Sequence, residues 1–402
     1  MGGVRPAQDG LQQARVAVAA VFLTNGALFA NMVPRYPEIK RSLGLSNAAL
    51  GSALAAFPLG ALLAGLLAAT VIRRWGSARV ATGGVTMLAL AIALVAVAGS
   101  WLVLAAVLFV AGAVDAIIDV AQNAHGLRVQ RLYRRSIVNS FHGVWSIGAV
   151  LGGLMGAAAV GLDVSLTVHL TTSAVLFSAV ALVAYRFLLS GPDEGDGAAD
   201  AVLPEAGRGL RSPALRAVAP LILTLGVLAA CGAVVEDAGS SWGSLYLTTN
   251  LSASIATGAL AFVALQTAMT VGRLTGDRVV DRFGQRRVVR AGGALTATGM
   301  GLALAIPTIG TALAGFALAG LGVATLVPAV MHTANEVPGI PIGVGLTIVS
   351  WMLRIGFLLS PPLVGLIADW SSLRVGLLSV VVAGAVTVAL GGVLLNDADP
   401  HR

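Results

Sequence analysis

The sequence predicts an all-α membrane protein with twelve transmembrane helices in two pseudo-symmetric six-helix bundles. Of its 402 residues, 57% are hydrophobic and 11% are charged, whereas soluble domains carry about 25% charged residues. One helical crossing of a bilayer takes about 20 apolar residues, so the chain has room for about a dozen crossings. The apolar runs are long and do not alternate with polar residues, which excludes a transmembrane β-barrel.

Twelve apolar runs, separated by charge clusters or by Gly, Pro and Ser, predict the individual helices. The first run follows Arg5 and Arg15 and is too long for the core of a signal peptide, so we expect it to remain as the first helix. The predicted helices cover residues 15–34, 47–71, 80–98, 101–124, 137–160, 165–188, 215–237, 253–275, 288–307, 311–334, 341–367 and 374–395.

The distribution of basic residues predicts the orientation of the chain. With both termini in the cytoplasm, most arginines fall in cytoplasmic loops, as the positive-inside rule requires. Arg35, Lys40, Arg41 and Arg374 then lie outside, and the basic first outer loop is an exception without an explanation. Because the basic residues sit in short clusters between apolar runs, they indicate topology and not nucleic-acid binding. We expect a multi-pass protein of the bacterial cytoplasmic (inner) membrane.

A hydrophilic stretch divides the chain into two halves. Residues 191–212 are rich in Gly, Ala and acidic side chains, which predicts a flexible cytoplasmic linker. The sequence therefore predicts an N-terminal six-helix bundle at residues 1–190 and a C-terminal six-helix bundle at residues 213–402.

An internal repeat relates the two halves. Residues 71–80 align with residues 279–288 at their Arg, aromatic, Gly, Arg and Val positions, in the loop after the second helix of each half. In both halves, glycines or prolines also predict a break in the fifth helix, at residues 148–153 and 360–365. Two parallel six-helix repeats are typical of secondary transporters.

The second copy of the repeated loop, residues 272–287, resembles the G-x-L-x-D-R-x-G-R-R loop of the major facilitator superfamily, and the resemblance extends over essentially the whole chain. It implies a carrier for a small-molecule substrate. Arg73 stands in the first copy where that family has an acidic residue. The residues that the resemblance assigns to the conformational loops are Arg74, Gly76, Asp277, Asp281, Arg282 and Gly284. Residues 119–125, 140–148 and 236–247 resemble YbjJ-like carriers, a bacterial branch distantly related to fucose permeases.

Acidic residues in the predicted fourth helix are candidates for proton coupling. Asp115, Asp119 and Asn123 follow one another at four-residue steps and form one polar stripe. Two like charges one turn apart in a medium of low dielectric disfavour joint ionisation, so one carboxyl could hold a proton. Alternatively, Asp119 caps the helix or pairs with a loop arginine. His142 is a candidate relay, or a neutral histidine bonded to a backbone carbonyl.

Polar and aromatic residues in other helices are candidates for solute binding. Arg354 lies near the middle of the predicted eleventh helix, one turn after Trp351, where an arginine needs a carboxylate partner or an anionic solute. The alternative is a permanent ion pair with Glu336 or Asp115. Glu236 ends the predicted seventh helix at its outer side. The remaining candidates are Asn25, Asn31, Trp145 and Gln266, which could instead join helices to one another.

Enzyme motifs are not supported, so we expect neither an enzyme nor a cofactor or metal site. Residues 239–243 fit G-x-S-x-G, but they follow a predicted membrane helix and not the strand that a nucleophile elbow needs. Cys231 is the single cysteine. The expected function is proton-coupled transport by a monomer embedded in the lipid bilayer. Gly148, Gly152, Gly153 and Gly156 resemble the antiporter glycine motif, which favours efflux. Uptake of a sugar-like solute by symport and a non-transporting sensor or scaffold are the alternatives.

Overall fold

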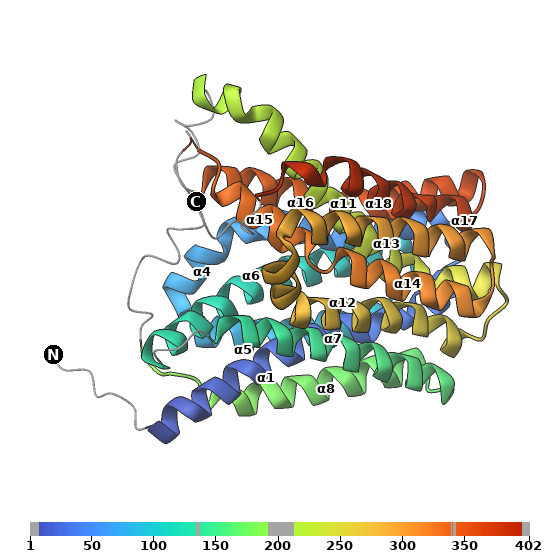
Figure 1. Ribbon diagram of the computed structural model, residues 1–402. Coiled ribbons are helices and arrows are strands. Elements are labelled where there is room, and N and C mark those ends of the chain that lie inside the picture. Colours follow the sequence, from blue (N-terminus) through green and yellow to red (C-terminus); the bar gives the residue numbers. More distant parts are fainter. Residues whose placement is uncertain (1–7, 134–136, 192–212, 339, 341–342, 396–402) are drawn as a thin grey trace. The chain divides into compact units, whose positions relative to one another are not determined.

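The computed structural model describes residues 8–133, 137–191, 213–338, 340 and 343–395, and in this part of the chain it contains helices and connecting turns but no strand (Figure 1). Twelve helical segments among these residues are long and apolar enough to cross a membrane. Both observations agree with the predicted all-α fold. The linker expected at 191–212 lies, from residue 192 onward, outside the described residues.

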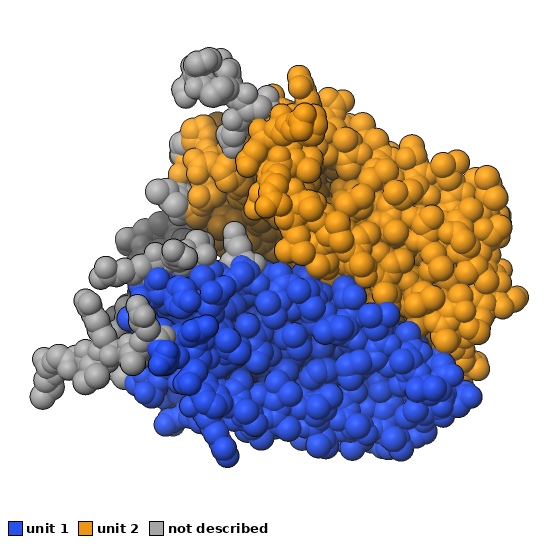
Figure 2. All heavy atoms as spheres, turned by 60° about the horizontal axis from the view of Figure 1, so that its bottom comes forward, with its two compact units in different colours: residues 1–35, 56–199 blue, residues 36–55, 200–402 orange. Residues whose placement is uncertain are grey.

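The chain forms two compact units (Figure 2). Unit 1 comprises residues 1–35 and 56–199, and unit 2 comprises residues 36–55 and 200–402. The helix α3 (Asn47–Ala64) is therefore divided, since its first residues belong to unit 2 and its last residues to unit 1.

Unit 1 consists of the helices that precede and follow the first repeated loop. They are α1 (Gln8–Met32), η1 (Val33–Arg35), the end of α3, η2 (Gly65–Leu67), α4 (Ala68–Trp75), α5 (Ser77–Val95), α6 (Trp101–Tyr133), α7 (Val138–Gly161) and α8 (Leu166–Tyr185).

Unit 2 contains the second repeated loop. Its elements are α2 (Tyr36–Ser42), the start of α3, α11 (Pro213–Asn250), α12 (Ile255–Phe283), α13 (Gln285–Ala305), α14 (Ile309–Val323), α15 (Leu326–Asn335), α16 (Val344–Trp370), α17 (Leu373–Gly376), α18 (Leu378–Leu390) and η3 (Gly391–Val393).

One glycine ends a helix and starts the next in each repeated loop. Gly76 separates α4 from α5 with φ 81° and ψ 147°. Gly284 separates α12 from α13 with φ 80° and ψ 145°. Glycine adopts a positive φ readily because it has no Cβ. The two copies of the sequence repeat thus share one backbone conformation at the aligned position.

The breaks expected in the fifth helix of each half are absent from the described residues. The helix α7 is continuous through residues 148–153, and α16 is continuous through Pro361 and Pro362. Glycines of α7 instead lie against the backbone of α1, with Gly148 at Leu23, Gly152 at Ala27 and Gly156 at Asn31. Small residues at four-residue steps let two helices approach closely.

The helix α11 is longer than predicted and runs to Asn250 instead of ending at residue 237. Hydroxyl side chains after that point bond to carbonyl groups of the same helix, as Ser240 Oγ does to the carbonyl oxygen of Glu236 at 2.9 Å. These local bonds satisfy the polar side chains without ending the helix. Glu236 and Asp237 therefore lie in the interior of a helix, and the prediction that they end it was wrong.

Candidate functional site

Three polar residues from three helices of unit 1 form one hydrogen-bonded group. The Asn25 Nδ2 of α1 donates to Asp115 Oδ1 of α6 at 2.7 Å. The Trp145 Nε1 of α7 donates to Asn25 Oδ1 at 2.8 Å. Asn25 is only 4% exposed, and its amide uses both ends. The structure thus brings together three residues that the sequence analysis selected separately.

Close packing of α1 on α7 positions this group. Gly26 lies directly against the backbone of Trp145, and a larger residue there would separate the two helices. Because Asn25 is the neighbour of Gly26, the close approach places its amide beside the indole of Trp145. The same asparagine then reaches α6, where Asp115 lies near the middle of a helix that runs from Trp101 to Tyr133.

Asp115 has no cationic partner within the described part of the chain. No lysine or arginine nitrogen there lies within 4.0 Å of its carboxylate, and the hydrogen bond found for it comes from the neutral amide of Asn25. Within a membrane an ionised carboxylate is costly unless it is paired, so a carboxyl in this setting is a candidate for binding a proton.

A second polar group lies one helical turn along α6 and α7. His142 Nε2 and Asn123 Oδ1 are 3.1 Å apart. Asn123 Nδ2 donates to Asp119 Oδ1 at 3.1 Å and to the Asp119 carbonyl oxygen at 2.8 Å. Asp119 and His142 are both exposed. The stripe predicted for α6 is thus bonded to α7 through Asn123.

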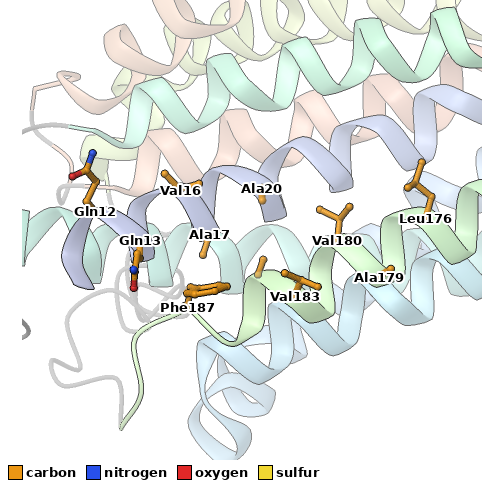
Figure 3. Close-up of a pocket in the computed structure, with 11 residues that line it drawn as sticks. Gln12, Gln13, Val16, Ala17, Ala20, Leu176, Ala179, Val180, Val183 and Phe187 are labelled. Carbon is orange, nitrogen blue, oxygen red and sulfur yellow. The ribbon is translucent and has the colours of Figure 1, made fainter. Parts of the chain in front are cut away.

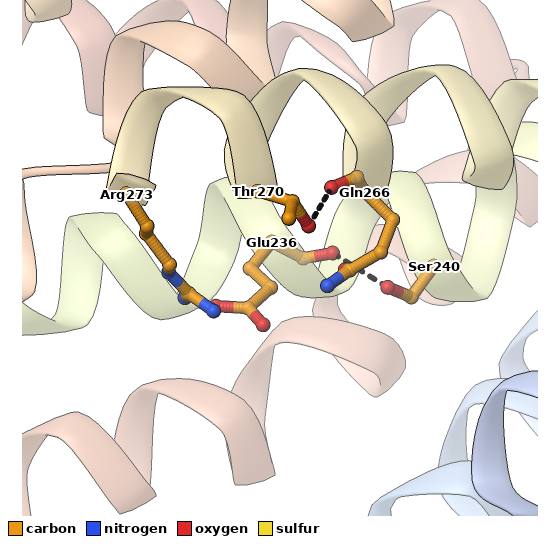
Figure 4. A network of polar contacts seen from close by, with 5 residues as sticks. All are labelled: Glu236, Ser240, Gln266, Thr270 and Arg273. Carbon is orange, nitrogen blue, oxygen red and sulfur yellow. Dashed lines mark hydrogen bonds and ion pairs between the residues drawn. The ribbon is translucent and has the colours of Figure 1, made fainter. Parts of the chain in front are cut away.

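An ion pair joins α11 and α12 in unit 2. Arg273 Nη2 lies 3.3 Å from Glu236 Oε2, and both side chains are partly exposed. Figure 4 shows Glu236, Gln266 and Arg273 on facing sides of the two helices. Arg273 lies within α12 and pairs with a predicted solute-binding residue.

Gln266 is 2% exposed, and its Nε2 has no hydrogen-bond partner among the described residues. Asp237 Oδ1 accepts a bond from Ser241 Oγ at 2.7 Å. A buried polar atom almost always has a partner, so the Nε2 of Gln266 is a candidate for binding a solute or water.

Trp351 and Arg354 lie one turn apart on α16 and are both exposed, Trp351 by 38%. Within the described ranges, no ion pair joins Arg354 to Glu336. Arg354 therefore stays a candidate for binding a solute.

The residues of the repeated loops lie at helix ends. Arg74 is exposed in the last turn of α4. In unit 2, Asp277 and Asp281 line a cavity of about 260 Å³ together with Arg273, Gln285 and His332. The Arg282 guanidinium lies 5.4 Å from the ring centroid of Phe283.

The sequence analysis missed a buried network in unit 1. Arg35 Nε donates to His169 Nδ1 at 3.1 Å, and His169 Nε2 and Asn31 Oδ1 are 2.6 Å apart. Asn31 Nδ2 donates to Ser173 Oγ at 2.7 Å. Arg35 is 3% exposed. These bonds supply partners for Arg35, one of the basic residues expected outside, and they use the side chain of Asn31, a candidate for solute binding.

Comparisons with known proteins identify the chain's relatives. Residues 18–246 and 236–402 match the family model of the Major Facilitator Superfamily. The chain is 31% identical to the membrane protein MosC of Rhizobium meliloti, over all of this chain and 94% of that protein. It is 28% identical to an uncharacterized MFS-type transporter of Yersinia pestis, over 92% of each chain. The crystal structure of the nucleoside transporter NupG matches with a TM-score of 0.73 at 15% identity, over 96% of this chain and 98% of that one.

Proposed function

The chain belongs to the Major Facilitator Superfamily, and we propose that this membrane transporter couples the passage of a small organic solute to protons by alternating access. The observation that carries the proposal is Asp115, a carboxyl near the middle of a membrane helix, bonded to a neutral amide and without a cation beside it in the described part of its unit.

Proton binding at Asp115 would change the polar group around it. The ionised carboxylate accepts a hydrogen from the amide of Asn25, and a protonated carboxyl can also donate one. Asn25 in turn accepts from the indole of Trp145. A proton on Asp115 thus changes the bonds open to two predicted solute-binding residues. His142, one turn away in the Asp119 group, would serve as a relay toward water.

Each unit, taken by itself, offers polar groups that could bind a solute. Unit 1 offers the amide of Asn25 and the indole of Trp145. Unit 2 offers the Glu236–Arg273 pair, the unpartnered Nε2 of Gln266, and Arg354 with Trp351. Cationic, amide and aromatic groups together suit a solute with an anionic or hydroxyl-rich part and a flat or apolar part.

The direction of transport and the branch of the family belong to the proposal. The glycine motif of α7 resembles that of antiporters and favours efflux, although its contacts with α1 serve packing in either direction. The resemblance of residues 119–125, 140–148 and 236–247 to YbjJ-like carriers supports the alternative, symport of a sugar-like solute.

Transport in proteoliposomes tests the proton role. The first step is to screen metabolites and antibiotics for solutes that raise the melting temperature of the purified protein. A solute found in this way is then used with Asp115→Asn, which keeps the size of the side chain and removes its proton. We expect this variant to lose transport driven by a pH gradient and to keep counterflow of labelled solute without a gradient. Asp163→Asn, in an exposed loop of the same unit, should behave as the unchanged protein does.

Each outcome decides one part of the proposal. Gradient-driven transport that survives in Asp115→Asn would remove Asp115 from the proton pathway. With an acid-outside gradient, accumulation of the solute inside the vesicles would show symport. Expulsion of the solute from the vesicles would show antiport. Absence of counterflow with every solute that stabilises the protein would favour a sensor with a carrier fold.

A further inference from the structure

A groove runs between α1 and α8 in unit 1, apart from the polar groups described above. It has a volume of about 570 Å³. Apart from Gln12 and Gln13 at one end, apolar residues line it. They are Val16, Ala17, Ala20, Leu176, Ala179, Val180, Val183, Ala184 and Phe187. Figure 3 shows Ala17 and Ala20 of α1 beside Val180, Val183 and Phe187 of the α8 segment.

The groove exists because the two helices are held together at one end and lined by small residues toward the other. The Arg35–His169 and Asn31–Ser173 bonds join the end of α1 to the start of α8. Toward the start of α1 and the end of α8, no comparable polar bond between the two helices is found in the described residues. Four of the residues that line the groove there are alanines, which have small side chains. Alanines leave space that larger apolar residues would fill.

The dimensions of the groove match one leaflet of a bilayer. Leu176 is near the midpoint of α8, and Phe187 follows its end. At 1.5 Å per helical residue the lining residues extend over about 15 Å, which is half of a hydrocarbon core of about 30 Å. The groove is thus long and narrow, which suits a hydrocarbon chain.

Charge distinguishes the two ends of the groove. Its polar end lies where α1 starts and α8, α4 and α6 end, and this end of unit 1 carries the basic residues. Those described are Arg15, Arg73, Arg74, Arg79, Arg128, Arg131 and Arg186. Among them, Arg186 is exposed and directly precedes Phe187, which lines the groove. Asp9 is the acidic residue described in the first turn of α1. Basic side chains next to the hydrocarbon boundary attract anionic lipid headgroups.

We infer that this groove is a binding site for one anionic phospholipid. An acyl chain lies along the apolar lining from the end of α8 to the middle of the membrane. The phosphate lies at the open end, where the amide groups of Gln12 and Gln13 can donate hydrogens to it and Arg186 supplies positive charge. The site is separate from the proposed solute and proton groups, so it does not depend on the proposed function.

Native mass spectrometry of the full chain in detergent tests the site. The probes are palmitoyl-oleoyl-phosphatidylglycerol and, with identical acyl chains, palmitoyl-oleoyl-phosphatidylcholine. We expect one copy of phosphatidylglycerol to remain bound at collision energies that remove phosphatidylcholine. Val183→Trp fills the groove and should abolish that retained copy. Leu182→Trp is the matched control, because the neighbouring Leu182 is 54% exposed against 56% for Val183 and does not line the groove.

A charge variant tests the headgroup. Arg186→Gln should weaken phosphatidylglycerol binding about fivefold and leave phosphatidylcholine unchanged, since a basic residue near the surface contributes a modest attraction to anionic lipid. Arg131→Gln changes an exposed residue at the same end of unit 1 that does not neighbour a lining residue in the sequence, and it should weaken binding much less. Equal retention of the two lipids would overturn the headgroup assignment. Retention of phosphatidylglycerol by Val183→Trp would overturn the site itself. So would a dimer of the unchanged protein that is absent in Val183→Trp.

Discussion

His169 shows how single residues hold a charge inside the membrane-spanning part of unit 1. Its Nδ1 accepts a hydrogen from Arg35, so its Nε2 carries the ring hydrogen and donates to Asn31 Oδ1. Arg35 Nη2 also donates to the carbonyl oxygen of Val164 at 2.7 Å. Each of these buried groups has a partner, which is the condition under which polar side chains tolerate burial.

Removing Asn31 from this network should destabilise the protein. Asn31→Leu preserves the side-chain volume but leaves the ring N–H of His169 and the hydroxyl of Ser173 without their partner. An unsatisfied buried polar group costs about 1–3 kcal/mol, and we expect a loss of this size in the free energy of unfolding, measured by denaturant titration in detergent. Asn335→Leu, at an exposed position, is the control. Equal stability of the two variants would show that the network is not needed.

At this scale the sequence predicts which residues matter better than it predicts their contacts. Asn25, Asp115 and Trp145 were selected because polar groups in apolar helices need a reason to be there. They are 90 and 120 residues apart, counted from Asn25. Which of them bond depends on the rotation and neighbours of three helices, and one sequence contains no measure of either. The partner of Arg35 was not predicted for the same reason, because His169 lies far along the chain.

At the scale of elements, hydropathy predicts the number of spans but not their ends. A helix needs about 20 apolar residues to cross the hydrocarbon core of a membrane, so each apolar run of that length predicts one helix. The end of α11 was placed too early because Glu236, Asp237 and the serines after them look like a boundary. In the structure the Arg273 pair and the bonds of Ser240 and Ser241 accommodate these side chains within the helix.

The glycines of α7 set the distance between α7 and α1, and this makes a prediction. A Cβ on Gly152 would collide with the carbonyl oxygen of Ala27. We expect Gly152→Ala to lower the free energy of unfolding by about 1–3 kcal/mol, the usual cost of overpacking, in the same denaturant titration. Gly83→Ala on α5 is the control, because nothing lies within 4 Å of a Cβ there. That control should be neutral or slightly stabilising, since alanine favours helix over glycine. If Gly152→Ala is as stable as the Gly83→Ala control, then α1 and α7 can move apart at little cost.

At the scale of the whole molecule, the boundary between the two compact units does not fall only at the predicted linker. The chain also passes between the units after residues 35 and 55. Residues 36–55 belong to unit 2 although they precede most of unit 1. Their packing explains the assignment, since Gly51 lies against the backbone of Pro361 and Gly365 lies against that of Asn47. A pattern of apolar runs orders helices along the chain and contains no information on such distant contacts.

Asp369, at the end of α16, provides the cap for the first turn of α3. Its Oδ1 accepts from the backbone N–H of Asn47 at 3.0 Å and from Asn47 Nδ2 at 2.9 Å, and its Oδ2 accepts from the N–H of Ala48 at 2.8 Å. A carboxylate at a helix N-terminus is favoured by the free N–H groups and the helix dipole. The start of a helix shared by the two units is thus held by a side chain 322 positions further along the chain.

Removal of this cap should loosen the start of α3 and leave the rest of unit 2 intact. We expect Asp369→Ala to speed amide hydrogen exchange at residues 47–50 by about 2- to 30-fold, which corresponds to the usual cost of losing an N-cap. Ser254→Ala removes the N-cap of α12, where Ser254 accepts from Thr257, and should speed exchange there but not in α3. If Asp369→Ala leaves exchange at residues 47–50 unchanged, packing by Gly51 and Gly365 holds the start of α3 without the carboxylate.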